Sequence, residues 1–276
     1  MKLATIRTAE GTRAVRVDGD TLVDLGASDL GDVLAREGWA EAAASATGQT
    51  YPAEGADYAP LVGRPSKVVC VGLNYRNHIA EMGRPMPEYP TLFPKWADCL
   101  IGAGDDIQRP AETQEFDWEV ELAVVIGRPV RRATTEQAEA AIAGFTVLND
   151  VTCRDWQFRT REWTQGKNWD STTPLGPVLV TPDELPGGVR PALRVTTTVD
   201  GEVMQDDSTA DLLFDPVALV EYVSTIIRLN PGDVIATGTP GGVGHARKPP
   251  VFLTAGQVVE CTIEGIGATV NRVVAG

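Results

Sequence analysis

The sequence predicts a mostly β, α+β fold with few helices. Segments with the alternating or fully apolar patterns of strands outnumber helical segments, and turn residues separate them at short intervals. Strands do not alternate regularly with helices, which argues against a doubly wound parallel sheet. A passage rich in proline and glycine, residues 51–66, predicts a boundary between a small N-terminal α+β domain (residues 1–62) and a main domain (residues 67–276).

The N-terminal domain is predicted to open with short strands around a tight turn. Strand patterns at residues 3–7, 14–17 and 21–25 surround Asp18-Gly19, and Asp-Gly between such runs is a strong hairpin signal. Residues 29–47 have the apolar spacing of a helix followed by an alanine-rich tail. We expect one helix there.

The main domain is expected to begin with an apolar strand at residues 67–72 and a short helix at 77–82. Four prolines predict a loop over residues 83–95. The remaining elements are strands at 115–126, 144–150, 177–181, 193–199 and 258–265, and helices at 134–143 and 216–229. The last helix is followed by Asn230-Pro231-Gly232, which is a helix stop signal.

The composition limits the function classes. A net charge of −14 disfavours nucleic acid and anionic membranes as partners but does not exclude an anionic substrate, because a basic pocket or a bound cation can reverse the sign inside a cleft. The four cysteines are widely spaced, as buried thiols in a reducing compartment would be. The N-terminus lacks the apolar core of a signal peptide, and no apolar run is long enough for a membrane helix. We therefore expect a cytoplasmic protein.

Several catalytic chemistries are disfavoured. The chain has only two histidines and no G-x-S-x-G motif, so serine-triad chemistry and the usual zinc sites are not expected. The loop GTPGGVG at residues 238–244 lacks the lysine of a phosphate-binding loop and the G-x-G-x-x-G spacing of a dinucleotide site. We expect its backbone to cradle a carboxylate or carbonyl of a substrate.

Three carboxylates predict a metal site. Glu119 and Glu121 are two apart on a predicted strand and therefore share a face, and Asp150 ends the next predicted strand. Carboxylates without imidazole or thiolate form a hard oxygen site, which suits Mg²⁺ or Mn²⁺. Alternating acids also occur on solvated strand faces, and the spacing alone leaves both interpretations open.

Two further residues are candidates for catalysis. His78 lies three residues before Glu81, so on a helical turn the carboxylate can orient the imidazole as a general base. Lys167 lies between polar residues in TQGKNWD. A single histidine is more often a packed or surface residue, and that alternative also stays open.

Five segments in this order resemble the fumarylacetoacetate hydrolase family: GLNYRNHIAEM, DWEVELAVVIG, LNDVTCRDWQ, QGKNWDSTTPLGP and GDVIATGTPGGVG. The resemblance runs from about residue 67 to the end of the chain. It implies the family's mixed β-roll with few helices, a homodimer, and a lid formed by residues 83–95. The segment before residue 67 looks like the small N-terminal domain of many bacterial members.

The resemblance also assigns expected roles. The matching residues are the Mg²⁺ or Mn²⁺ ligands Glu119, Glu121 and Asp150, the water-activating dyad His78 and Glu81, the charge-stabilising Lys167, and the substrate contacts Arg154, Gln157, Gly238 and Thr239. The implied activity is metal-dependent hydrolysis of a C–C bond in an acylpyruvate, a 2,4-dioxo acid such as a fumarylpyruvate-like substrate, to pyruvate and a carboxylic acid. A metal holding the 2-oxo acid would act as a Lewis acid, while His78 activates water and Lys167 stabilises negative charge.

Alternatives remain within and outside this chemistry. Oxaloacetate decarboxylation, isomerisation and dehydration of 2-oxo acids use the same enolate machinery, and a non-catalytic carboxylate-binding protein would be of another class. His245, Arg247 and Lys248 follow the glycine-rich loop and form either a solvated basic loop or a site for a second carboxylate of the substrate.

Overall fold

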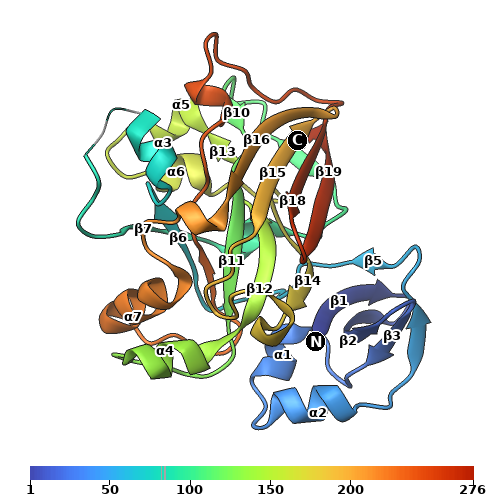
Figure 1. Cartoon of the computed structure of the whole chain (residues 1–276). Coiled ribbons are helices and arrows are strands. Elements are labelled where there is room, and N and C mark those ends of the chain that lie inside the picture. Colours follow the sequence, from blue (N-terminus) through green and yellow to red (C-terminus); the bar gives the residue numbers. More distant parts are fainter. Residues whose placement is uncertain (82, 84) are drawn as a thin grey trace.

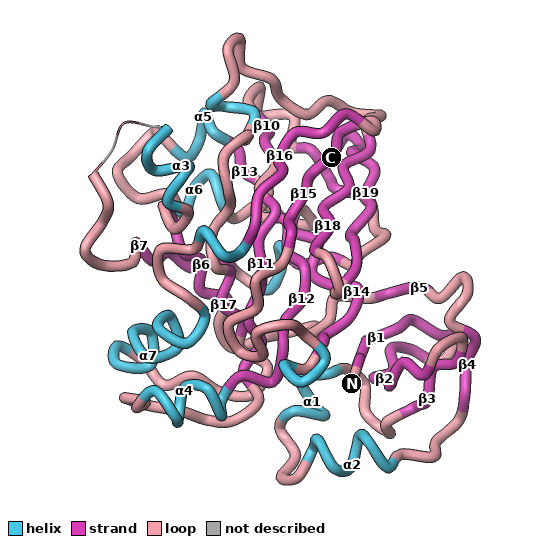
Figure 2. The backbone as a smooth tube through the Cα atoms, in the orientation of Figure 1, coloured by secondary structure: helices cyan, strands magenta, loops and turns pink. Residues whose placement is uncertain are grey.

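The computed structural model describes residues 1–81, 83 and 85–276, and the side chain of Glu81 is also outside the description. The fold is mostly β with few helices, as predicted (Figures 1 and 2). Its main sheet has the strand order β4-β3-β2-β1-β14-β12-β11-β17-β6-β7, and a second sheet has the order β16-β15-β18-β19-β9. No helix of the described residues is both long and apolar enough to cross a membrane.

The N-terminal segment contains β1 (Lys2–Thr8), β2 (Gly11–Asp18), β3 (Thr21–Asp24), α1 (Leu30–Leu34), α2 (Trp39–Ser45), β4 (Thr50–Pro52) and β5 (Asp57–Tyr58). The expected Asp18-Gly19 hairpin forms, with Asp18 paired to Thr21. The single helix expected at 29–47 is wrong, because Gly38 adopts a left-handed φ of 67° and separates two short helices. Pairing of β1 with β14 continues the sheet into the main part of the chain.

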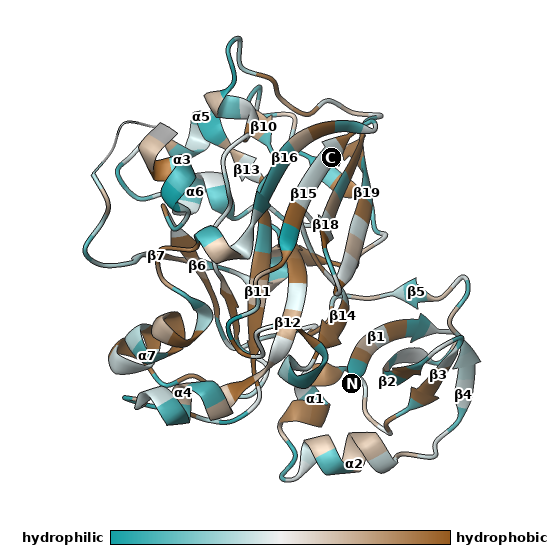
Figure 3. Ribbon diagram, viewed as in Figure 1, coloured by the Kyte–Doolittle hydropathy of each residue, from teal (hydrophilic) through white to brown (hydrophobic). Residues whose placement is uncertain are grey.

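The central strands are β6 (Val68–Gly72), β7 (Thr91–Lys95), β11 (Val120–Ile126), β12 (Ile142–Asn149), β14 (Thr173–Val180) and β17 (Val234–Ala236). Every residue of β11 and β12 is buried, which matches their apolar colouring in Figure 3. A loop through residue 95 is wrong, because residues 91–95 pair antiparallel with β6. Pro94 is accommodated there as one exposed residue of β7.

The strand expected at residues 115–126 is divided in two. β10 (Phe116–Asp117) pairs with β13 (Thr152–Cys153), whereas β11 starts only at Val120 and pairs with β12. The Asp117 carboxylate turns the chain between them by accepting hydrogen bonds from the backbone N–H groups of Trp118, Gly244 and His245 at 2.8, 2.7 and 3.0 Å. A buried side chain thus sets the break that alternation in the sequence does not reveal.

The remaining elements surround these sheets. They are the helices α3 (Arg76–Glu81), α4 (Thr135–Ala141), α5 (Arg154–Gln157), α6 (Thr164–Lys167) and α7 (Pro216–Ile226), and the strands β8 (Leu100–Ile101), β9 (Ile107–Arg109), β15 (Arg194–Val199), β16 (Glu202–Ser208), β18 (Val258–Ile263) and β19 (Gly267–Ala275). Helices α3, α5 and α6 gather on one side of the molecule, away from the N-terminal segment (Figure 1).

Candidate active site

Glu119, Glu121 and Asp150 meet where β11 and β12 lie side by side. Glu121 pairs with Leu148, and the backbone N–H of Asp150 donates to the carbonyl of Glu119 at 2.9 Å. One carboxylate oxygen from each of the three residues lies within 4.8 Å of the others. The side chains are almost completely buried, so the alternative of a solvated strand face is wrong.

Three buried cations surround these acids. Lys167 Nζ lies 2.7 Å from Glu119 Oε2 and 2.8 Å from Asp150 Oδ2. Arg154 Nη2 lies 2.7 Å from the other oxygen of Glu119. The third cation is Lys95, whose Nζ is 2.9 Å from Asp150 Oδ1. Sequence reasoning missed Lys95 because it ends a proline-rich segment expected to be a loop.

The acids differ in how their charge is balanced. Burial, then the nearby Asp150 and Glu119, raises the pKa of Glu121 well above its ordinary value. Burial also disfavours ionisation of Asp150, but Lys167 and Lys95 outweigh it and lower the pKa of that carboxyl. Asp150 is therefore held as a carboxylate. The ionised form of Glu121, in contrast, is disfavoured unless a further cation binds nearby.

The glycine-rich loop reaches the same site. The backbone N–H of Gly238 donates to Glu121 Oε2 at 2.8 Å, and Gly238 has a left-handed φ of 97°. A Cβ there would lie 2.9 Å from the carbonyl oxygen of Val71, so the position favours glycine sterically as well. Thr239 Oγ1 accepts a hydrogen bond of 2.8 Å from Gln205 Nε2. No sequence motif singled out Gln205.

Asp117 links two walls of the site. Besides holding residues 244 and 245, it accepts a 2.8 Å hydrogen bond from Arg154 Nε. Arg154 Nη1 in turn donates to Gln157 Oε1 at 3.0 Å. The side chain of Asp117 is fully buried and holds Arg154, which in turn contacts Glu119.

A cavity of about 110 Å³ lies at this site. His78, Glu119, Glu121, Arg154, Gln157, Lys167 and Thr239 contribute to its wall, together with Phe93, Phe158, Trp163 and the loop at 243–246. Gly72 lets Trp163 close in, because a Cβ there would lie 2.2 Å from the indole. Glu81 is the last residue of α3, and its expected contact with His78 falls outside the described residues.

The basic residues after the loop take separate positions. His245 lines the cavity, and its ring lies 5.2 Å from that of Phe158. Arg247 instead donates to the carbonyl of Met204 at 2.8 Å, and neither Arg247 nor Lys248 is among the described residues that line the cavity. Of the three basic residues, only His245 is placed to meet a bound molecule.

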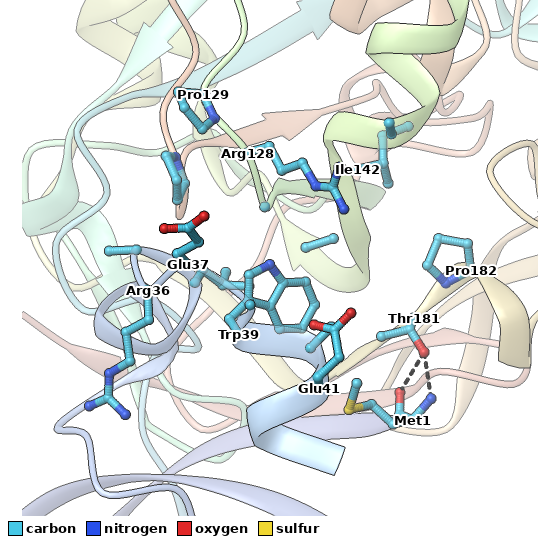
Figure 4. Close-up of a pocket in the computed structure, with 18 of the residues that line it drawn as sticks. Met1, Arg36, Glu37, Trp39, Glu41, Arg128, Pro129, Ile142, Thr181 and Pro182 are labelled. Carbon is cyan, nitrogen blue, oxygen red and sulfur yellow. Dashed lines mark hydrogen bonds between the residues drawn. The ribbon is translucent and has the colours of Figure 1, made fainter. Parts of the chain in front are cut away.

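A second, wider cavity of about 1020 Å³ lies between the α1–α2 segment and the turn after β11 (Figure 4). Trp39, Arg128 and Thr181 are among its lining residues. It contains none of the residues expected in the site and no cluster of carboxylates comparable to the acidic one, within the part of the chain that the structure describes. The acidic cluster therefore lies at the smaller cavity and not at the wider one.

Comparisons with known proteins agree with this arrangement. The family model described as fumarylacetoacetate (FAA) hydrolase C-terminal matches residues 67–274. The Bos taurus protein named oxaloacetate tautomerase FAHD2A, mitochondrial, is 47% identical over 77% of this chain and 68% of its own length. The Homo sapiens protein of the same name is 46% identical over the same shares.

Solved structures extend the likeness over the whole chain. A fumarylacetoacetate hydrolase from Exiguobacterium antarcticum has a TM-score of 0.89 at 35% identity and covers 100% of both chains. A 5-carboxymethyl-2-hydroxymuconate delta-isomerase from Mycobacterium smegmatis has a TM-score of 0.83 at 34% identity, again covering 100% of both. On the match of the family model and these relatives, the chain belongs to the fumarylacetoacetate hydrolase family.

Proposed function

We propose that the protein is a divalent-metal-dependent enzyme that interconverts the keto and enol forms of a small 2-oxo dicarboxylate, with oxaloacetate as its substrate. The observation that carries the proposal is a cluster of three buried carboxylates, two of which, Glu119 and Glu121, line one small cavity together with Lys167 and His78. Several relatives that are 44–47% identical are named oxaloacetate tautomerases, which favours this substrate over a larger acylpyruvate.

The residues present fit a divalent cation. Glu119, Glu121 and Asp150 offer only oxygen donors, and burial together with the nearby Asp150 and Glu119 raises the pKa of Glu121, an effect that a bound cation would offset. We propose Mg²⁺ or Mn²⁺ as the ion. When bound, it would supply Lewis acidity that draws electrons from the 2-oxo group of the substrate.

The protein's own groups would perform the proton transfer. The imidazole of His78 would accept the proton from C3 of oxaloacetate as the C3–H bond breaks and return it in the opposite direction. Lys167, whose pKa is raised by Asp150 and Glu119 against the effect of burial, stays an ammonium that can stabilise the enolate oxygen by a hydrogen bond, while solvent supplies the enol proton and takes up the proton held by His78. Arg154 and Gln157 would orient a carboxylate of the substrate.

Hydrolysis of an acylpyruvate is the second candidate. The same His78 would then deprotonate a water that attacks the distal carbonyl, and the bond between C3 and that carbonyl carbon would break to leave the pyruvate enolate. The position of His78 in the cavity wall favours it equally. Decarboxylation of oxaloacetate differs again, because it releases CO₂ and pyruvate without needing activated water.

One assay separates these reactions. With Mn²⁺ present, freshly dissolved enol oxaloacetate is followed with malate dehydrogenase, which consumes the keto form, and with lactate dehydrogenase, which consumes pyruvate. Tautomerisation accelerates only the first signal, whereas decarboxylation accelerates the second, and acetylpyruvate supplied instead yields pyruvate only through hydrolysis. No acceleration of either signal on either substrate at saturating Mn²⁺ would refute an enzymatic role.

His78→Ala and Lys167→Met extend this assay to the roles of the two residues. We expect each variant to lose about two orders of magnitude or more of the tautomerisation rate. The Phe158→Leu variant, which changes only the cavity rim, serves as a control and should retain a measurable rate. The homodimer and the cellular location remain predictions, and several relatives have "mitochondrial" in their names.

A further inference from the structure

Lys95 contacts the acidic site from outside the cavity. Its side chain is fully buried, its ammonium lies 2.9 Å from Asp150 Oδ1, and it is absent from the described residues that line the cavity. Lys167 contacts the other oxygen, Oδ2, at 2.8 Å, and it does line the cavity. Asp150 is thus held between one lysine that a bound molecule can reach and one that it cannot.

Lys95 also contacts the main chain that carries Lys167. Its Nζ donates a second hydrogen bond to the carbonyl oxygen of Lys167, the last residue of α6. One ammonium group at the end of β7 therefore connects Asp150, at the end of β12, with the backbone of α6. Because two hydrogen bonds from one buried group fix both partners relative to each other, their spacing does not depend on a bound ligand.

We propose that Lys95 is a positioning residue of the metal site. It holds Asp150 through one carboxylate oxygen, leaves the other to Lys167, and holds the backbone of Lys167 close to that carboxylate. The inference rests on the metal site of the proposed function and adds a residue that none of the sequence motifs contains. Groups that orient a metal ligand through a hydrogen bond commonly change metal affinity by 10- to 100-fold when they are removed.

The direction of the effect distinguishes positioning from charge alone. Removal of a cation close to a metal site would tighten metal binding if Coulomb repulsion were all that Lys95 contributed. Loss of positioning predicts weaker metal binding, because Asp150 Oδ1 loses its donor and the carboxylate is no longer held beside Glu119 and Glu121. Lys95→Met keeps most of the side-chain length while it removes both hydrogen bonds.

The chain offers a matched control in Lys67. This residue precedes Val68, the residue that pairs with Lys95, and its Nζ lies 2.7 Å from the fully buried carboxylate of Asp233. Neither Lys67 nor Asp233 lines the cavity or contacts the three acids, within the described residues. Lys67→Met therefore removes a partly buried lysine–aspartate pair in the same region without touching the acidic site.

The experiment measures Mn²⁺ affinity by the electron paramagnetic resonance signal of free Mn²⁺, and the Tm in EDTA and in saturating Mn²⁺. We expect Lys95→Met to weaken Mn²⁺ binding by about tenfold or more. Lys67→Met should lower the Tm by about 5 °C and leave the affinity within about twofold of the unchanged protein. Equal or tighter binding by Lys95→Met would overturn the inference.

A second variant and the Mn²⁺ binding of the unchanged protein distinguish the outcomes. If Lys95→Met does not fold, Lys95→Gln, whose shorter side chain cannot keep both hydrogen bonds, is measured in the same way and must also bind Mn²⁺ more weakly. Absence of Mn²⁺ binding by the unchanged protein would overturn the metal site and this inference together. Binding by the unchanged protein with undiminished affinity in the folded Lys95 variant would overturn only the role of Lys95.

Discussion

Two buried aspartates of this protein are held in different ways. Asp233 accepts hydrogen bonds from the backbone N–H groups of Lys67 and Asn230, from the Ser66 hydroxyl and from the Lys67 ammonium, at 2.6 to 2.9 Å. Asp150, equally inaccessible, is held within the described residues only by the side-chain ammonium groups of Lys95 and Lys167.

The difference separates structural from functional carboxylates. Backbone N–H groups cannot be withdrawn without unfolding, so Asp233 fastens the start of β6 to the turn before β17 permanently. The cations around Asp150 are ends of side chains, and one of them faces the cavity. A carboxylate paired with a cavity-lining side chain such as Lys167 can exchange that partner for an incoming metal ion, whereas a carboxylate bonded mainly by backbone N–H groups cannot.

The largest expected effect is a difference between the Asp150→Asn and Asp233→Asn variants. Asp150→Asn should lower kcat by about three orders of magnitude, since a metal ligand and the partner of Lys167 are lost together. Asp233→Asn should leave kcat nearly unchanged but lower the free energy of unfolding by about 2 kcal/mol. Steady-state rates and urea unfolding of both variants check this. A large fall in kcat for Asp233→Asn would remove the distinction.

An intermediate effect is expected at Asp117, which shares features of both aspartates because it accepts from backbone N–H groups and from Arg154. Asp117→Asn should raise KM by about tenfold, with a smaller change in kcat, because Arg154 and the loop at 244–245 lose their common anchor. Asp206→Asn, which breaks an exposed pair with Arg194, is the control. Equal KM values in the two variants would contradict the role of Asp117.

The smallest effect concerns pH and the metal-free protein. Burial and its acidic neighbours raise the pKa of Glu121 above that of the unfolded chain, so its contribution to stability is full at low pH and is lost as pH rises through the raised pKa. As pH rises from the ordinary pKa of a glutamate, 4.5, through the raised pKa of Glu121, stability in EDTA should fall by about 1.4 kcal/mol for each pKa unit of the shift.

Glu121→Gln isolates this contribution, because the amide cannot ionise. Its unfolding free energy in EDTA should change less with pH than that of the unchanged protein, whereas its Mn²⁺ affinity should be weaker. Parallel pH dependences of the two proteins would mean that Glu121 does not titrate in this range.

Much of the fold followed from local patterns. The strands at 67–72, 144–150 and 193–199 and the Asp18-Gly19 hairpin lie within about two residues of their expected places, because period-two apolar patterns and turn residues act locally. The errors have nonlocal causes. Residues 91–95 form a strand because β6 offers an edge to pair with, and residues 115–126 break because Asp117 binds a loop more than a hundred positions later.

The sequence by itself determined the residue types of the site and their order. Nine expected site residues have described side chains or backbone, and seven of them line the cavity together: Glu119, Glu121, His78, Lys167, Arg154, Gln157 and Thr239. The other two are Asp150 and Gly238, which contact this group through hydrogen bonds. Only the tertiary structure decided which further groups contact them: Lys95 and Gln205 reach the site from distant segments, and Asp117 holds Arg154 and residues 244 and 245. Spacing in a sequence reports which side chains share a face, but burial and charge balance depend on contacts that form only when distant segments pack together.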